Sequence, residues 1–167
     1  MMNRFVGACL FAGFALSSIA ADTAVQVQFD AGKAGPRQIE PLTERGVLRD
    51  YRAAWISMAQ ALEANNPDAL EGLFAGDAKD WLRETVANQE RSGVSQRYSE
   101  QNHHLEAVFY APEGDVMELH DTAEYRLQIL DGGKTVSDDH VSMHYVVLMT
   151  PGADRWVIRQ LQAVPRF

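Results

Sequence analysis

In the first half of the chain, apolar side chains recur at steps of three and four residues, which is the period of an amphipathic helix. The longest such stripe predicts a helix over residues 43–64; its members are Leu48, Tyr51, Trp55, Met58 and Leu62. Shorter stripes predict helices over residues 67–75, with Asn66 as N-cap, and over residues 78–92, with Gly93 as a left-handed terminator. The three tryptophans lie on apolar stripes, so we expect them in the core.

In the second half the period changes to two, which is typical of strands with one buried face. The alternation covers residues 105–110, 117–129, 141–149 and 156–164. Segments rich in Pro, Gly and Asp separate them, as expected of turns, at residues 112–115, 131–134 and 151–154. Sequential strands joined by short turns predict an antiparallel meander. Helices that precede strands predict an α+β fold, with the N-terminal helices packed on a four-stranded antiparallel sheet.

The first 20 residues have the three parts of a secretory signal peptide. Met1–Arg4 is positively charged, an apolar run follows from Phe5 to Leu16, and small residues at Ser18 and Ala20 form a cleavage site. We therefore expect a periplasmic or secreted protein, cleaved near Ala20 and without a stable membrane span afterwards. Two alternatives stay open: retention of the leader as an anchor, and lipidation of Cys9, against which its position inside the apolar run argues.

The remaining sequence divides into a flexible lead-in at residues 21–42 and one domain at residues 43–167. Within the lead-in, Val25, Val27 and Phe29 alternate with glutamines, so a short edge strand is the alternative. The net charge of −8, without a basic stripe or a glycine-rich phosphate loop, argues against a nucleic-acid partner. The single cysteine leaves with the leader, which removes thiol chemistry and disulfides from the mature chain.

Core landmarks spread over residues 43–164 follow a recognisable order. They are Trp55, Ala61, Leu62, Leu73, Gly76, Trp81, Gly93, Tyr98, Leu105, Val108 and Trp156–Ile158. In this order the chain resembles the nuclear-transport-factor-like (cystatin-like) superfamily, and in particular the intermembrane-space domain of plastid-division proteins. The resemblance implies a bent sheet wrapped around a long helix as a cone, whose mouth is a pocket or a docking surface. Enzymes of this superfamily use an Asp or a His–Asp pair in the cone, whereas other members bind peptides or dimerise through the sheet.

Asp121 is the best single candidate for chemistry. By alternation it shares the apolar face of its strand with Leu119 and Ala123, and a carboxyl group on a buried face is a candidate general acid or base. His120 is its candidate catalytic partner. Two structural alternatives stay open: a bulge that turns Asp121 outward, or pairing with Arg159, which would make both residues structural.

Candidate ligand-binding residues lie at the passage from helices to sheet and on the apolar face of the strands. They are Tyr98, His104, Tyr125, Met143 and Tyr145. Met117, Met143 and Met149 are further candidates to line an adaptable pocket for an apolar ligand.

All five histidines lie between His103 and His144, which suggests a metal site. However, His140 and His144 are four strand residues apart, roughly 13 Å, too far to share one ion. A cross-strand site with His120 has no carboxylate-rich motif to complete it. We therefore expect no metal and no other cofactor.

Three functions fit these observations. The first, which we favour, is an exported non-catalytic binding or assembly domain. It would use the cone pocket or the sheet face for a protein or a small ligand, and it would form a homodimer through the sheet. The second is a small-molecule isomerase or dehydratase with Asp121 as general base, which needs Asp121 inside a pocket. The third is a carrier of an apolar ligand.

Overall fold

The computed structural model describes residues 24–167, so the predicted signal peptide lies outside the described residues. Their helices and strands are β1 (Gln26–Asp30), α1 (Pro41–Ala64), the 3-10 helix η1 (Pro67–Leu70), α2 (Gly76–Ser92), β2 (Val94–Tyr110), β3 (Met117–Asp131), β4 (Lys134–Pro151) and β5 (Trp156–Val164). Within residues 24–167, no helix has the length and apolar character that crossing a bilayer requires.

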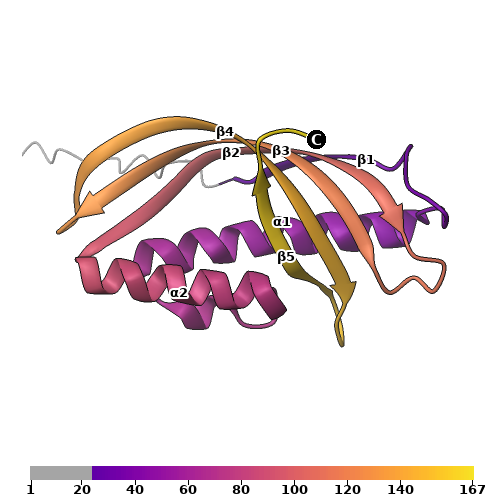
Figure 1. The fold of residues 1–167 in the computed structure, drawn as a ribbon, viewed down its shortest axis with the longest axis horizontal. Helices are drawn as coiled ribbons and strands as arrows, with labels where there is room; N and C mark the ends of the chain where they lie inside the picture. The colour runs from indigo at the N-terminus through magenta and orange to yellow at the C-terminus, as the bar shows by residue number, and fades with distance from the viewer. Residues whose placement is uncertain (1–23) are drawn as a thin grey trace, which may run out of the picture.

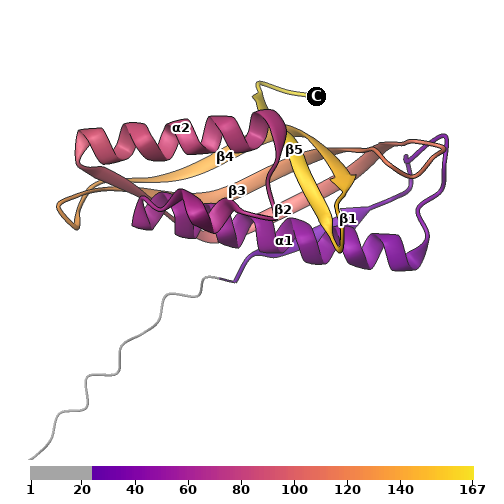
Figure 2. The same ribbon diagram turned by 90° about the horizontal axis from the view of Figure 1, so that it is seen from below.

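The strands form one sheet in chain order that arches over the helices without closing (Figure 1). Seen from below, α1 and α2 lie on the same side of the sheet (Figure 2), and β5 is its last strand. This is the expected α+β arrangement, with one correction to the strand count. The sheet has five strands instead of four, because residues 26–30 of the expected lead-in pair in parallel with β2. The edge-strand alternative for the lead-in is therefore the correct one.

The helices start and end mostly where the sequence indicates. α1 ends at Asn65, which has a left-handed φ of 50°, and α2 ends at Gly93, with a φ of 71°. The side chain of Asn66 caps the next turn by accepting a hydrogen bond from the Asp68 amide. The predicted helix over 67–75 is shorter than expected, because Gly72 takes a φ of 76° and the chain turns there.

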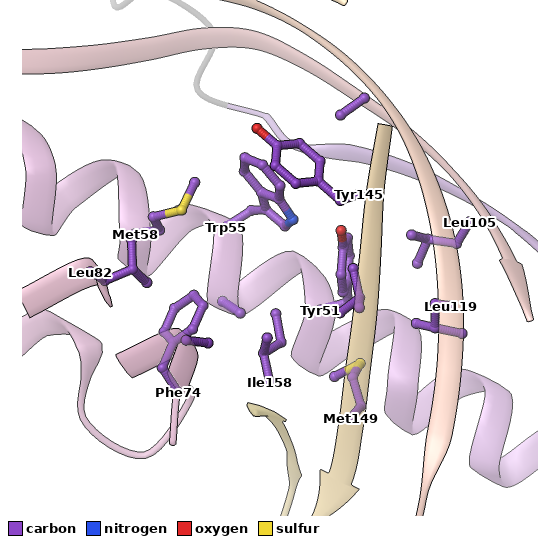
Figure 3. Close-up of a cluster of buried hydrophobic side chains, with 14 of the residues drawn as sticks. Tyr51, Trp55, Met58, Phe74, Leu82, Leu105, Leu119, Tyr145, Met149 and Ile158 are labelled. Carbon is purple, nitrogen blue, oxygen red and sulfur yellow. The ribbon is translucent and has the colours of Figure 1, made fainter. Parts of the chain in front are cut away.

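The core lies between α1 and the concave face of the sheet (Figure 3). Tyr51 and Trp55 of α1 are almost fully buried, and the sheet contributes Leu105, Leu119 and Met149 from three neighbouring strands. Burial of such side chains stabilises the fold by about 1.5–3 kcal/mol each relative to an exposed position. The same face of the sheet carries the polar residues described next.

Candidate functional site

A buried polar cluster joins α1 to the middle of the sheet. Oδ2 of Asp121 on β3 accepts a hydrogen bond from the Tyr51 hydroxyl at 2.6 Å and lies 2.8 Å from Nδ1 of His103 on β2. The side chains of Asp121 and His103 are both fully buried. The predicted burial of Asp121 is thus correct, and its partners are a tyrosine and a histidine.

His103 is a residue that the sequence reasoning did not assign to this site. It continues the alternation of Leu105 and Ala107 toward the N-terminus of β2, so the signal was present. It was missed because the predicted strand began at residue 105, whereas β2 begins at Val94. Tyr51 lies on the predicted apolar stripe of α1, where it was interpreted as a core residue only.

His120 is not the partner of Asp121. Adjacent residues of a strand point to opposite faces of the sheet, and the His120 ring stacks on Phe167 at 4.2 Å between centroids. Its Nε2 lies 3.4 Å from Glu118. The structure therefore gives no support to a His120–Asp121 pair.

The two structural alternatives for Asp121 are also wrong. β3 and β4 pair without a register shift from residue 117 to residue 129, so no bulge turns Asp121 outward on that side. Arg159 is exposed and donates a hydrogen bond to Thr150 Oγ1 at 3.0 Å. A register shift in the β4–β5 pairing, between Leu148 and Met149, changes the alternation that had placed Arg159 inside.

A cavity of about 550 Å³ opens between α2 and the concave face of the sheet. Its lining is aromatic and aliphatic, with one carboxylate and several neutral polar groups: Leu62, Asp77, Ala78, Trp81, Thr85, Gln96, Tyr98, Leu127, Tyr145 and Gln160–Ala163. Asp121 and His103 are not part of it. Trp81 is 49% exposed, so its assignment to the core is wrong.

Tyr145 and Trp55 connect the cavity to the buried cluster. Tyr145 lines the cavity and is the cross-strand neighbour of Asp121. Trp55 packs on Tyr145 with 5.6 Å between ring centroids and on His103 with 4.3 Å. Figure 3 shows Trp55 and Tyr145 side by side above Tyr51. Aromatic side chains therefore lie between Asp121 and this cavity.

The predicted ligand-binding residues are only partly brought together. Tyr98 and Tyr145 line the cavity. Tyr125 lies behind them, with its hydroxyl 2.9 Å from that of Tyr145 and its ring 5.1 Å from that of Tyr98. His104 instead lines a smaller, polar hollow of about 240 Å³ with residues of β1 and β3, and Met143 packs against the core.

The methionines expected to line a pocket do not line the cavity between α2 and the sheet. Met117 and Met149 are fully buried core residues, and neither they nor Met143 line the cavity. The cavity therefore lacks the adaptable methionine surface that was expected among the described residues.

Burial keeps the tyrosines of this region protonated. It raises the pKa of Tyr98 and of Tyr145, and for Tyr145 the hydrogen bond with Tyr125 adds to the effect. Burial also raises the pKa of Tyr51 well above the usual value, with the neighbouring Asp121 as the second cause. These phenols act as neutral hydrogen-bonding groups and ring faces at physiological pH.

The remaining histidines lie away from the cavity. His144 approaches Thr122 Oγ1 at 3.3 Å, and its ring lies 4.9 Å from Phe167, which also stacks on His120. Among residues 24–167, no group of three or more His, Cys, Asp or Glu side chains is placed to hold a metal ion.

Comparison with solved structures finds the same fold in the intermembrane space region of the chloroplast protein ARC6. The TM-score is 0.59 at 12% identity, over 77% of this chain and 98% of that chain. A scytalone dehydratase-like protein from Novosphingobium aromaticivorans gives a TM-score of 0.45 at 14% identity, over 74% of this chain and 85% of that chain. ActVI-ORFA from Streptomyces coelicolor gives 0.47 at 12% identity, over 74% of this chain and 98% of that chain.

The chain therefore has a nuclear-transport-factor-like α+β fold, and the resemblance to the plastid-division domain is confirmed at the level of fold. No protein-family model matches the chain, and comparison with curated proteins finds no match. Because identities this low show the fold alone, function has to be argued from the site.

Proposed function

We propose that this chain is an exported, non-catalytic binding domain that holds a small ligand in the cavity between α2 and the sheet. The observation that carries the proposal is the cavity itself, whose volume of about 550 Å³ lies in the range of small-molecule sites. Its apolar and aromatic walls supply contact area, and a few polar groups supply orientation. The leader-like sequence of residues 1–20 supports the export part.

The position of Asp121 favours binding over catalysis. A general base must reach within hydrogen-bond distance of the proton that it removes. Asp121 is fully buried, and both of its observed partners, Tyr51 and His103, belong to the protein. A ligand in the cavity meets Tyr145 and Tyr98 instead.

Filling the cavity tests the proposal. Ala163 lines the cavity, and a tryptophan in its place (Ala163→Trp) should block much of the volume. We expect this variant to bind the neutral apolar dye Nile red at least tenfold more weakly than the parent protein, as measured by dye fluorescence. Ala153→Trp, in the exposed turn before β5, is the matched control and should bind normally. Equal binding by both variants, or no binding by the parent, would overturn the proposal.

A second candidate is isomerase or dehydratase chemistry at the Asp121–His103 pair. One observation favours it: within the described residues, Oδ1 of Asp121 and Nε2 of His103 are buried without a hydrogen-bond partner. Unpaired buried polar atoms cost stability and are more typical of working sites than of optimised cores. If the cluster is kept for chemistry, the triple replacement Tyr51→Phe, His103→Phe and Asp121→Leu, which leaves none of its hydrogen-bonding groups behind, should leave thermal stability unchanged or raise it. A large loss of stability would mark the cluster as structural.

Self-association through the outer face of the sheet stays a prediction, as does a protein partner. Size-exclusion chromatography with light scattering over a range of concentrations measures whether the protein self-associates. A mass that stays monomeric at high concentration would argue against the homodimer.

A further inference from the structure

Among the described residues that line the cavity, one side chain is formally charged, and it is a carboxylate. Asp77 lies in the first turn of α2, and the other polar side chains of the lining, Thr85, Gln96, Gln160 and Gln162, are neutral. Within the described residues, the side chain of Asp77 makes no hydrogen bond or ion pair. None of the described residues that line the cavity is a lysine, arginine or histidine, so this lining offers no cationic side chain to an anionic ligand.

The basic residues of α2 are engaged elsewhere. Lys79 Nζ lies 2.7 Å from Glu71, and Arg83 lies 3.6 Å from the same carboxylate. They therefore do not neutralise Asp77 directly. The N-terminus of α2 would by itself favour an anion, but Asp77 already places a negative charge in that first turn.

Three aromatic rings complete the lining: Trp81, Tyr98 and Tyr145. Trp81 is half-exposed, which is unusual for so large a side chain and places it in contact with solvent and cavity alike. The phenols of Tyr98 and Tyr145 are engaged by Gln96 and Tyr125, at 3.1 and 2.9 Å. Each of these hydroxyls already makes a hydrogen bond within the protein, and the two rings add aromatic faces to the lining.

We propose that the cavity binds a small organic cation with an apolar envelope, such as a quaternary or methylated ammonium group. The aromatic rings attract the cation through their quadrupoles, and Asp77 supplies the countercharge. The apolar walls take up the methyl groups. This inference rests on the proposed binding function of the same cavity.

Choline and its uncharged isostere 3,3-dimethylbutan-1-ol test the charge preference directly, because they share shape and differ in one atom. We expect choline to bind the parent protein about fivefold tighter or more by isothermal titration calorimetry at low salt. Asp77→Asn should weaken choline binding and leave binding of the isostere unchanged. Asp80→Asn, on the exposed side of the same helix and outside the cavity lining, is the matched control and should change neither. Trp81→Leu keeps apolar bulk, so it should lower the preference for choline.

Two groups of results would overturn the inference. If the isostere or the anion 3,3-dimethylbutanoate binds as tightly as choline, the cation preference is wrong while ligand binding in the cavity stands. If none of the three probes binds although Nile red does, the class of ligand is wrong. A failure of Nile red to bind the parent protein would overturn the proposed function itself, which keeps the two conclusions distinguishable.

Discussion

A buried hydrogen bond, from Tyr51 to Asp121, links α1 to the sheet. The Tyr51 hydroxyl reaches across from the helix to Asp121 at 2.6 Å in a fully buried environment. Such a contact fixes both position and rotation of the helix, since a buried carboxyl left without its donor costs free energy. Apolar contacts alone, such as those of Trp55 with Tyr145, tolerate small shifts.

Removing this hydroxyl is therefore a sensitive test at the residue scale. Tyr51→Phe keeps the ring and deletes one buried hydrogen bond, so we expect a loss of about 1–3 kcal/mol in the free energy of unfolding by urea. Tyr110→Phe is the control, because Tyr110 is also buried but its hydroxyl makes no hydrogen bond that the described residues show. Equal effects of the two substitutions would contradict the assigned role of the Tyr51–Asp121 contact.

At the scale of elements, β1 is the part of the fold that the sequence left open. Val25, Val27 and Phe29 alternate with glutamines, a pattern too short to distinguish an edge strand from the expected flexible lead-in. What decides between them is β2, whose edge offers unpaired amide and carbonyl groups opposite residues 26–30. Parallel pairing places Val27 beside His103 and Phe29 beside Leu105.

Two truncated chains separate the two interpretations of β1. A chain that begins at Ala24 keeps the strand, and one that begins at Lys33 lacks it. We expect the second to lose about 2–4 kcal/mol in the free energy of unfolding, from the apolar packing of Val25, Val27 and Phe29. It should also aggregate more readily, because the edge of β2 is uncovered. Equal urea midpoints would mean that β1 contributes only a tether.

The other elements show where periodicity suffices and where it fails. The α1 stripe is as predicted, because one face of that helix is clearly apolar. The last strand has the predicted bounds, residues 156–164, but the register shift beside Arg159 breaks its alternation. The first half of β2 was missed because Ser95, Gln96 and Arg97 carry no apolar alternation. Its strand geometry depends on pairing with β3, which is a long-range contact that local sequence does not record. The missed start of β2 is also why His103 was not connected with Asp121.

At the scale of the whole molecule, the cavity was not predicted for a similar reason: it depends on how distant elements pack. Trp81 lies on an apolar stripe, so its sequence position indicates the core. Its exposure follows from how α2 lies against β5 and leaves the sheet uncovered next to it, which is a matter of helix packing. Tyr98 and Tyr145 could be anticipated as ligand contacts from alternation and fold resemblance together. The contribution of Asp77 and Trp81 to the cavity wall could not be anticipated from the sequence.

The concentration of tyrosines in this interior makes the stability of the whole domain sensitive to alkaline pH. The pKa values of Tyr51, Tyr98, Tyr125 and Tyr145 are all raised, with burial as the largest cause. A raised pKa in the folded state means that the unfolded chain releases its protons first, so stability is intact below about pH 10 and falls as pH rises above it.

Absorbance at 295 nm during an alkaline titration measures the ionisation of these tyrosines. We expect Tyr51, Tyr98, Tyr125 and Tyr145 to remain un-ionised well above pH 10 in the folded protein and to ionise normally in urea. Their ionisation should coincide with loss of far-ultraviolet circular dichroism, because a phenolate cannot stay buried beside Asp121 or another tyrosine without a compensating charge. Ionisation of all five tyrosines near pH 10 with the fold intact would show that the interior is open to solvent, and would contradict the enclosed arrangement of the Tyr51–Asp121–His103 cluster.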